Sequence, residues 1–200
     1  MHEAVLAWVG QFRTTDDLAV LDIGGRDLNG NTRGFFPNAS PYTVLDLRPG
    51  KGVDIIADAA TWDGKVDTFD LATESWTPTK IAYDLVLCTE TFEHTEKWRE
   101  IIATAYAALR PGGWLVFTCA GPGRPEHSGV EAVWGLIGDE WYSNVSAAEI
   151  AGELHDQGWT DIEARQLGLD TQGKAVKPLA SSEVLFGAEL SRTAAGCLGA

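Results

Sequence analysis

The sequence has few cysteines, little positive charge and no long hydrophobic run. Its three cysteines, at positions 88, 119 and 197, show no spacing typical of a metal site and are odd in number, which fits a reducing compartment. Only 15 Lys and Arg accompany 29 Asp and Glu, giving a net charge of −14, and no basic patch for a phosphate backbone is evident. The longest apolar runs are only strand-sized, so we expect neither a signal peptide nor a membrane span. These absences predict a cytoplasmic protein that binds neither nucleic acid nor membrane.

What is present fits one folded domain. The chain has 200 residues, of which 44% are hydrophobic, and that is enough to bury a core. We expect a single domain over residues 1–190 and a flexible tail over 191–200, which is rich in Ala, Gly and Ser/Thr. The sequence does not predict the oligomeric state.

Hydrophobic periodicity predicts strands alternating with helices. Helices are expected at 2–13, at 96–109 and at 147–157, the last with a capping box from Ser146 and Glu149. Strands are expected at 18–23, 42–47, 53–57, 84–88 and 114–119, followed by an antiparallel pair near 160–167 and 182–190. Short strands rich in Val, Ile and Leu are typical of a parallel sheet covered on both faces. Residues 60–82 form a long polar connection, and connections of that length are usually functional or mobile.

Two strand ends carry the residues of a nucleotide-type site. The stretch Val20-Leu-Asp-Ile-Gly-Gly25 takes an apolar strand into adjacent glycines, and Val44-Leu-Asp-Leu47 ends the next strand on Asp46. Glycines let the backbone approach a ligand closely, and an acid at the second strand end accepts hydrogen bonds from ribose hydroxyls. This pattern predicts a cofactor that contains adenosine.

The glycine loop argues against a dinucleotide. It reads Gly24-Gly-Arg-Asp-Leu-Asn-Gly30, so Arg26 and Leu28 stand where small residues are expected. Asp22 and Asp27 would repel a bound pyrophosphate, whereas an amino-acid tail with an ammonium group suits an acidic loop. Here the chain resembles the class I S-adenosylmethionine-dependent methyltransferases of the methyltransferase type 11-like branch. The resemblance continues, in the family's order, through Gly52-Val-Asp-Ile-Ile-Ala-Asp-Ala59, Tyr83-Asp-Leu-Val-Leu-Cys-Thr-Glu-Thr-Phe-Glu-His94 and Leu109-Arg-Pro-Gly-Gly-Trp-Leu-Val-Phe117.

The resemblance implies a fold and a set of cofactor contacts. The fold would be an α/β, Rossmann-like, doubly wound sheet of seven strands, mostly parallel with a late antiparallel strand, and with helices on both faces. Arg26 would meet the carboxylate of S-adenosyl-L-methionine, or would simply be a surface Arg beside Asp27. Asp58 would recognise the adenine amino edge together with the Ala59 backbone, or would only close a turn. The cofactor-binding residues expected on this basis are Asp22, Gly24, Gly25, Arg26, Asp46, Leu47, Asp58, Ala59 and Thr89.

Three side chains are candidates for catalysis, namely Glu90, His94 and His127. His94 matches the family's frequent Glu-His pair and would act as a general base, or would anchor the next helix. His127 lies where related enzymes place a histidine on the substrate side, or is an ordinary loop residue. Trp141 and Tyr142 would wall the acceptor pocket; Trp62 and Trp76 would do the same, or would simply be packing residues of the long connection. Histidines 2, 94, 127 and 155 show no recognised metal-ligand spacing, so no metal is expected.

The function predicted from these residues is methyl transfer, most simply to an oxygen or nitrogen of a small molecule such as a sugar or a secondary metabolite. One alternative is a degenerate cofactor-binding or interaction module that has lost transfer, since the loop lacks a glycine at position 26. A nicotinamide-dependent oxidoreductase is disfavoured, because the glycine loop is irregular and a Tyr-x-x-x-Lys pair is absent from the sequence. A protein or RNA acceptor is not excluded by the sequence.

Overall fold

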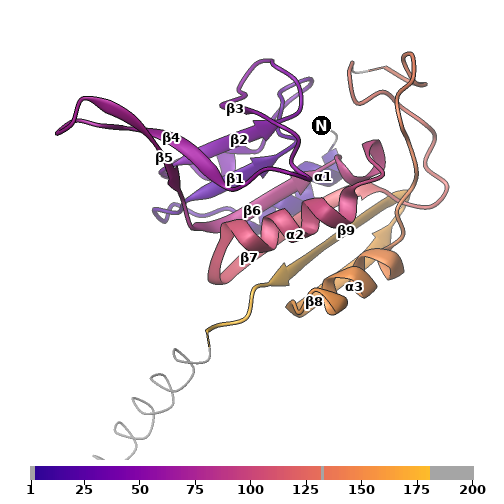
Figure 1. Cartoon of the computed structure of the whole chain (residues 1–200). Helices are drawn as coiled ribbons and strands as arrows, with labels where there is room; N and C mark the ends of the chain where they lie inside the picture. The colour runs from indigo at the N-terminus through magenta and orange to yellow at the C-terminus, as the bar shows by residue number, and fades with distance from the viewer. Residues whose placement is uncertain (1–2, 132, 181–200) are drawn as a thin grey trace, which may run out of the picture.

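The computed structural model describes residues 3–131 and 133–180. Its main element is a seven-stranded sheet with the order β3-β2-β1-β6-β7-β9-β8. The first five strands in that order pair in parallel, and β9 runs antiparallel to both of its neighbours, β7 and β8. The predicted fold class, a mostly parallel Rossmann-like sheet with a late antiparallel strand, is therefore confirmed (Figure 1).

The strands of this sheet are mostly buried at its centre, in β1, β2 and β6, and mostly exposed or half-buried at the edge strand β8. Their bounds are β1 Val20–Ile23, β2 Tyr42–Asp46, β3 Ile55–Ile56, β6 Tyr83–Thr89, β7 Leu109–Ala120, β8 Thr160–Leu167 and β9 Asp170–Val176. All four residues of β1 are buried, as is expected of a central strand that is covered on both faces.

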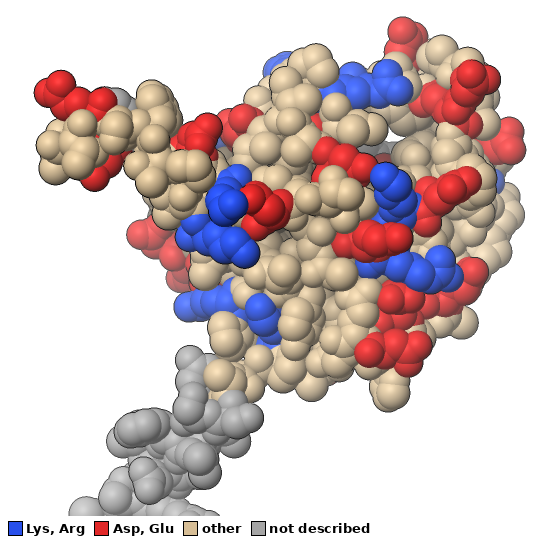
Figure 2. Space-filling view, viewed as in Figure 1, with Lys and Arg blue, Asp and Glu red and all other residues tan. Residues whose placement is uncertain are grey.

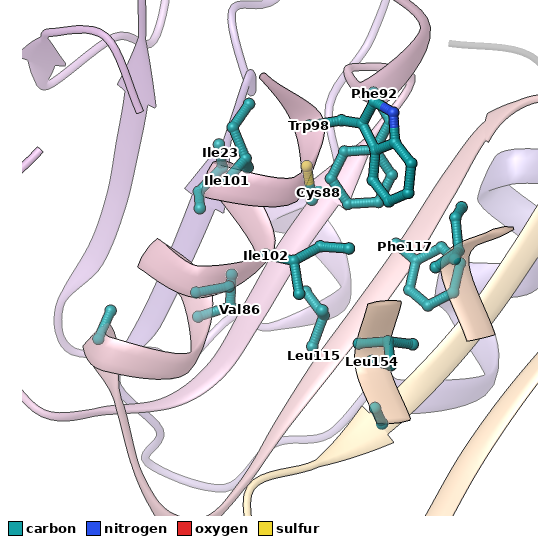
Figure 3. Close-up of a cluster of buried hydrophobic side chains, with 14 of the residues drawn as sticks. Ile23, Val86, Cys88, Phe92, Trp98, Ile101, Ile102, Leu115, Phe117 and Leu154 are labelled. Atoms are coloured by element: carbon teal, nitrogen blue, oxygen red, sulfur yellow. The ribbon is translucent and has the colours of Figure 1, made fainter. Parts of the chain in front are cut away.

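Helices cover both faces, and alternate residues of each strand face opposite sides. Helix α1 (Glu3–Val9), which continues into the 3₁₀ turn η1 (Gly10–Phe12), packs on one face against Val20 and Val44. Helices α2 (Trp98–Ala108) and α3 (Ala147–Asp156) pack on the other face. Figure 3 shows the core on that side, where Phe92, Trp98 and Ile102 meet Phe117 and Leu154.

Helix α3 begins as its sequence predicts. The Ser146 side chain accepts a hydrogen bond from the Glu149 backbone N–H, and the Glu149 carboxylate accepts one from the Ser146 N–H. Val145 and Ile150 are both buried on either side of this capping box, in the positions of a hydrophobic staple. Gly158 follows the helix with a φ of 82°, a conformation that glycine adopts without steric cost.

The structure differs from the sequence prediction in three places. The antiparallel partner of β7 is β9, a segment for which no strand was predicted, and the strand expected near 182–190 lies outside the described residues. Strand β7 starts at Leu109 rather than at 114, so Pro111-Gly112-Gly113 lies within it. The connection at 60–82 contains a two-stranded antiparallel hairpin, β4 (Lys65–Asp70) with β5 (Ser75–Lys80).

The hairpin projects from the body of the molecule (Figure 1). All six residues of β5 are exposed. The side chains of this strand therefore do not contribute to the core. Acidic side chains recur around the visible face and on the hairpin (Figure 2). Among the described residues, no helix is long and apolar enough to cross a membrane.

Candidate active site

A cavity of about 770 Å³ opens at the carboxyl ends of the parallel strands β1, β2 and β6. This is the edge where an open α/β sheet binds its ligands. Nearly every site residue predicted from the sequence lines it, as the following do: Gly24, Gly25, Arg26, Asp46, Leu47, Asp58, Ala59, Thr89, Glu90, His94 and His127. Segments that are far apart in the chain therefore meet here, including the first glycine loop and the loop that follows β7.

Two glycines shape one end of the cavity. Gly24 has a φ of 73°, and a Cβ there would overlap the Thr91 hydroxyl, while a Cβ on Gly25 would lie 2.6 Å from Cγ of Asp22. The backbone therefore turns in a space that only glycine fits. The chain consequently presents bare main chain to the cavity at this point.

Asp22 is the one predicted cofactor residue that does not line the cavity. It is buried beneath the loop, where its Oδ2 accepts a hydrogen bond of 2.8 Å from the Tyr42 hydroxyl and one of 3.3 Å from Thr32. Burial raises the pKa of Asp22 to about 6, although these two hydrogen bonds oppose the shift. Asp22 thus supports the glycine turn from below rather than facing a ligand.

Asp46 ends β2 with its carboxylate fixed in place. Its two oxygens accept hydrogen bonds from the backbone N–H groups of Arg26 (3.3 Å) and Arg48 (2.9 Å). A carboxylate has about four acceptor sites, so it retains capacity for the two hydroxyls of a ribose. The next side chain, Leu47, is 65% exposed at the cavity wall. An exposed leucine beside a fixed carboxylate provides an apolar surface for a flat base.

Arg26 contacts another part of the same protein. Its Nη2 donates hydrogen bonds to the carbonyl oxygens of Gly129 (3.1 Å) and Val130 (2.8 Å). Asp27, the expected surface neighbour, instead pairs with Lys51 at 2.7 Å. Arg26 therefore ties the glycine loop to the loop after β7, and it still lines the cavity.

Next to the end of β2, Asp58 and Ala59 follow strand β3, which pairs with β2. Asp58 pairs with Lys97 at 2.9 Å and accepts a hydrogen bond from the Ala60 N–H. The hydrogen bond from Lys97 is the main reason why the pKa of Asp58 lies below its usual value. The carboxylate is thus charged at neutral pH and faces the cavity beside Ala59.

Glu90 belongs to an ion-pair cluster that the sequence did not reveal. It follows β6 with a φ of 55° and pairs with Arg124 at 2.6 Å, while Arg124 also pairs with Asp170 at 2.7 Å. Thr118 donates a further hydrogen bond to Glu90. The sequence analysis missed Arg124, which also lines the cavity, because its partners lie 34 and 46 positions away and leave no spacing signal. Glu90 is thereby occupied in holding the loop after β7.

The two candidate histidines lie against each other. The ring centroids of His94 and His127 are 4.9 Å apart at an interplanar angle of 88°, and the Tyr142 ring contacts both. Burial, followed by the charge of His127, lowers the pKa of His94 to about 4, so its imidazole is neutral at pH 7. Glu93, fully buried, places Oε1 3.8 Å from His127 Nε2. Burial and the charge of Glu90 raise the pKa of Glu93 well above its usual value.

The predicted aromatic wall is only partly assembled. Trp141 lines the cavity, as do Val133 and Trp134 from the same loop, and all three side chains are exposed toward it. Tyr142 contacts the histidine pair from outside the lining. Trp62 lies at a separate shallow pocket near Lys80, and Trp76 lies on the projecting hairpin, 68% exposed. Among the described residues, the tryptophans that line the cavity therefore come from the loop after β7 and not from the 60–82 connection.

Comparison with known proteins places this fold and site in a family. The model of a methyltransferase domain family matches residues 8–164, which is most of the chain. The chain therefore belongs to this methyltransferase domain family, and its fold is that of the class I S-adenosylmethionine-dependent enzymes. The resemblance seen in the sequence is confirmed, and with it S-adenosylmethionine as the cofactor, in place of the nicotinamide-dependent alternative.

Solved structures support the same fold. The 1,6-didemethyltoxoflavin-N1-methyltransferase of Burkholderia thailandensis is 17% identical, with a TM-score of 0.59, over 88% of this chain and 79% of that one. An S-adenosylmethionine-dependent methyltransferase from Mesorhizobium loti is 16% identical, with a TM-score of 0.58, over 85% of this chain and 95% of that one. Phosphoethanolamine N-methyltransferase 2 of Haemonchus contortus is 16% identical, with a TM-score of 0.55, over 88% of this chain. The chain spans about half (52%) of that last protein. No curated protein sequence matches.

Proposed function

We propose that this methyltransferase transfers the methyl group of S-adenosylmethionine to an oxygen or nitrogen atom of a small molecule. The observation that carries this proposal is the continuity of the cavity. The glycine turn, Asp46 and Leu47 line the same space as His94, His127 and Trp134. Its volume of about 770 Å³ is within the range of small-molecule sites. A donor and an acceptor bound at the two ends would share one enclosure.

The residues at the first end fit the cofactor. Gly24 and Gly25 leave room for the methionine portion, because a Cβ on either would overlap a neighbouring side chain. The fixed Asp46 carboxylate would accept hydrogen bonds from the ribose hydroxyls, and Leu47 would pack on the adenine. Asp58 and the Ala59 backbone would meet the adenine edge, and Thr89 would line the path toward the acceptor. Arg26 donates a hydrogen bond to the loop after β7. It would therefore contact the methionine portion while it also holds that loop.

The other end fits an acceptor with a flat or apolar part. Trp134 and Trp141 are 77% and 46% exposed, respectively, and aromatic surfaces of this kind gain most when a ligand covers them. Glu140 holds their loop by accepting hydrogen bonds from the backbone N–H groups of Gly129 (3.0 Å) and Ile137 (2.7 Å). The Burkholderia structure has both 1,6-didemethyltoxoflavin, a small molecule, and S-adenosylhomocysteine bound, which supports an acceptor of this size.

Methyl transfer mainly requires the protein to position the acceptor against the methyl group of the cofactor. The bound cofactor supplies an electrophilic sulfonium methyl group, so the hard chemistry is its own. The loops held by Arg26 and Arg124 would keep the acceptor in line and exclude water, and orientation of this kind is worth roughly 7–11 kcal/mol of barrier. His94 is neutral and faces the acceptor end together with His127. A hydroxyl acceptor would need its proton removed there, whereas an amine that is already deprotonated would not.

Calorimetric titration with S-adenosylmethionine, S-adenosylhomocysteine and NADH tests the cofactor end. We expect micromolar binding of the two adenosyl compounds, and its loss in Asp46→Ala. Asp17→Ala, which removes an exposed carboxylate outside the cavity, is the matched control and should bind normally. Binding of NADH alone would refute the assignment.

A screen with radiolabelled methyl groups tests the acceptor. Small aromatic hydroxyl, amine and sugar compounds, a protein extract and total RNA would each be offered. We expect label only in the small-molecule set, and label in protein or RNA would overturn the proposed acceptor class. Tight cofactor binding with no label in any set would favour the degenerate binding module.

A further inference from the structure

Three side chains of the metal-ligating type converge at the acceptor end. Glu93 and His94 belong to the 3₁₀ turn η3 (Phe92–His94), and His127 comes from the loop after β7. One ligand atom of each lies within 4.8 Å of the other two, and His127 Nε2 lies 3.8 Å from Glu93 Oε1. With bonds of about 2.0–2.2 Å, ligand atoms around a divalent transition metal lie roughly 3–4 Å apart. Small side-chain adjustments would therefore close this group around one ion.

Two atoms of this cluster are buried without a partner among the described residues. They are Oε2 of Glu93 and Nδ1 of His94. Glu93 is 0% exposed, and its other oxygen accepts a hydrogen bond of 3.0 Å from the Ala120 N–H, which fixes the direction of the carboxylate. A buried polar atom with no partner is costly. Coordination of a cation would remove that cost.

The surrounding charges also suit a cation. Arg124 is the nearby positive group, and it is paired with both Glu90 (2.6 Å) and Asp170 (2.7 Å). Together with Glu93, these make three carboxylates against one guanidinium. The Tyr142 ring packs against both histidines, with centroids 5.5 and 5.2 Å away. This packing limits the orientations of the imidazole rings.

We propose that Glu93, His94 and His127 bind one divalent transition-metal ion, with Zn²⁺ as the best-suited ion. Two imidazoles and one carboxylate favour Zn²⁺ and its first-row neighbours over Mg²⁺ and Ca²⁺, which prefer all-oxygen sites. Spacing along the chain gave no sign of this site, because His127 lies 33 positions after His94 (127 − 94 = 33). Three protein ligands leave coordination positions open, as in catalytic zinc sites. Those positions would face the cavity, which both histidines line.

The role of the ion rests on the proposed function, although the binding itself does not. A hydroxyl oxygen of the acceptor would occupy an open position, and the ion would make its proton easier to lose to water as the acceptor enters, before water is excluded from the site. An oxygen–carbon bond to the methyl group would then form while the carbon–sulfur bond breaks. The electron pair of that bond stays on sulfur, giving a neutral thioether and a methylated oxygen. This chemistry favours an oxygen acceptor over a nitrogen one.

The test uses the full chain without a histidine tag, because a tag would itself bind metal. After treatment with a chelator, the protein is titrated with Zn²⁺ and Co²⁺ by calorimetry, and with Co²⁺ by visible absorption. We expect one ion per chain. The affinity for both ions should fall by about 10- to 100-fold or more in Glu93→Gln and in His127→Asn. The Gln side chain can still accept the hydrogen bond from the Ala120 N–H. His155→Asn makes the same substitution at a histidine whose side chain is 84% exposed and should bind like the parent.

Circular dichroism and S-adenosylhomocysteine binding, measured on each variant, establish that it is folded. Failure of the parent protein to bind Zn²⁺ or Co²⁺ would overturn the proposal, as would equal affinity in Glu93→Gln, His127→Asn and the parent. Binding of Mg²⁺ in preference to both ions would also overturn it. Metal binding without any S-adenosylhomocysteine binding would contradict the proposed function and leave the metal site standing. The reverse result would contradict only the metal site.

Discussion

Replacing Asp22 by Asn should change how the stability of the protein depends on pH. The carboxyl is fully buried under the glycine turn, and burial raises its pKa from 3.8 to about 6. Because the folded state holds this proton more tightly, Asp22 contributes most to stability at low pH, and the contribution is lost as pH rises through 6. The difference between the two pKa values (6 − 3.8 = 2.2) corresponds to about 3 kcal/mol.

Urea unfolding of both proteins at pH 5 and pH 7.5 measures this effect. The range avoids the isoelectric point near 4.5, where solubility is lowest. Over this interval the parent should lose about 1.4 kcal/mol of stability from Asp22 alone, since only the upper part of its titration is covered. The free energy of unfolding of Asp22→Asn minus that of the parent should therefore be higher at pH 7.5 than at pH 5 by that amount. Any change in the hydrogen bonds that the neutral carboxyl makes with Tyr42 and Thr32 adds a constant offset, which the difference between the two pH values removes.

Asp17→Asn makes the same charge change at an exposed position and reports the contribution of net charge alone. A difference between parent and Asp22→Asn that stays constant from pH 5 to pH 7.5 would refute the reasoning. It would mean that Asp22 titrates alike in the folded and unfolded chains. A difference of opposite sign would mean that the hydrogen bonds from Tyr42 and Thr32 outweigh burial.

Three further outcomes follow from the geometry. Ser146→Ala removes the cap of helix α3 and should cost about 1 kcal/mol in urea unfolding; no loss would show that the capping box is redundant. Gly24→Ala places a Cβ against Thr91 at a φ of 73° and should weaken S-adenosylhomocysteine binding at least about tenfold, or about 1.4 kcal/mol, in calorimetry. Gly34→Ala, where a Cβ would meet nothing, should not. Leu47→Ala should weaken the same binding by about 1 kcal/mol through lost apolar contact, whereas a similar loss in Leu71→Ala, on the hairpin, would argue against an adenine contact.

The sequence predicts the parallel half of the fold well because that half is built from apolar strands. Strands β1, β2 and β6 consist mostly of apolar residues, and helix α3 has both of its end signals. Strand β9 escaped prediction because its buried side chains include Thr171 and Gln172, which carry no apolar periodicity. The sequence did not predict the β4–β5 hairpin, for the opposite reason. Its strands bury too little for a pattern to arise, and all of β5 is exposed.

The two proposed ends of the site also differ in how well the sequence predicts them. The cofactor end depends on residues close in sequence to strand ends, so Gly24, Gly25 and Asp46 could be located from local motifs. The acceptor end depends on contacts between distant segments, such as the Arg124 ion pairs and the meeting of His94 with His127. A single sequence contains no signal for such pairings. The roles predicted for individual residues at both ends stay predictions until the variants above are measured.

The two hydrogen bonds from Arg26 attach the loop after β7 through its backbone and not through its side chains. Nη2 of Arg26 binds the carbonyl oxygens of Gly129 and Val130, and every amino acid has such a carbonyl. Trp134 and Trp141, whose side chains line the cavity and would face the proposed acceptor, take no part in those two hydrogen bonds. Mutations in the loop can therefore alter which compound is accepted while the loop stays fastened to the glycine turn. Directed evolution of new acceptor specificity would accordingly randomise Val133, Trp134 and Trp141 and keep Arg26 and Glu140 unchanged.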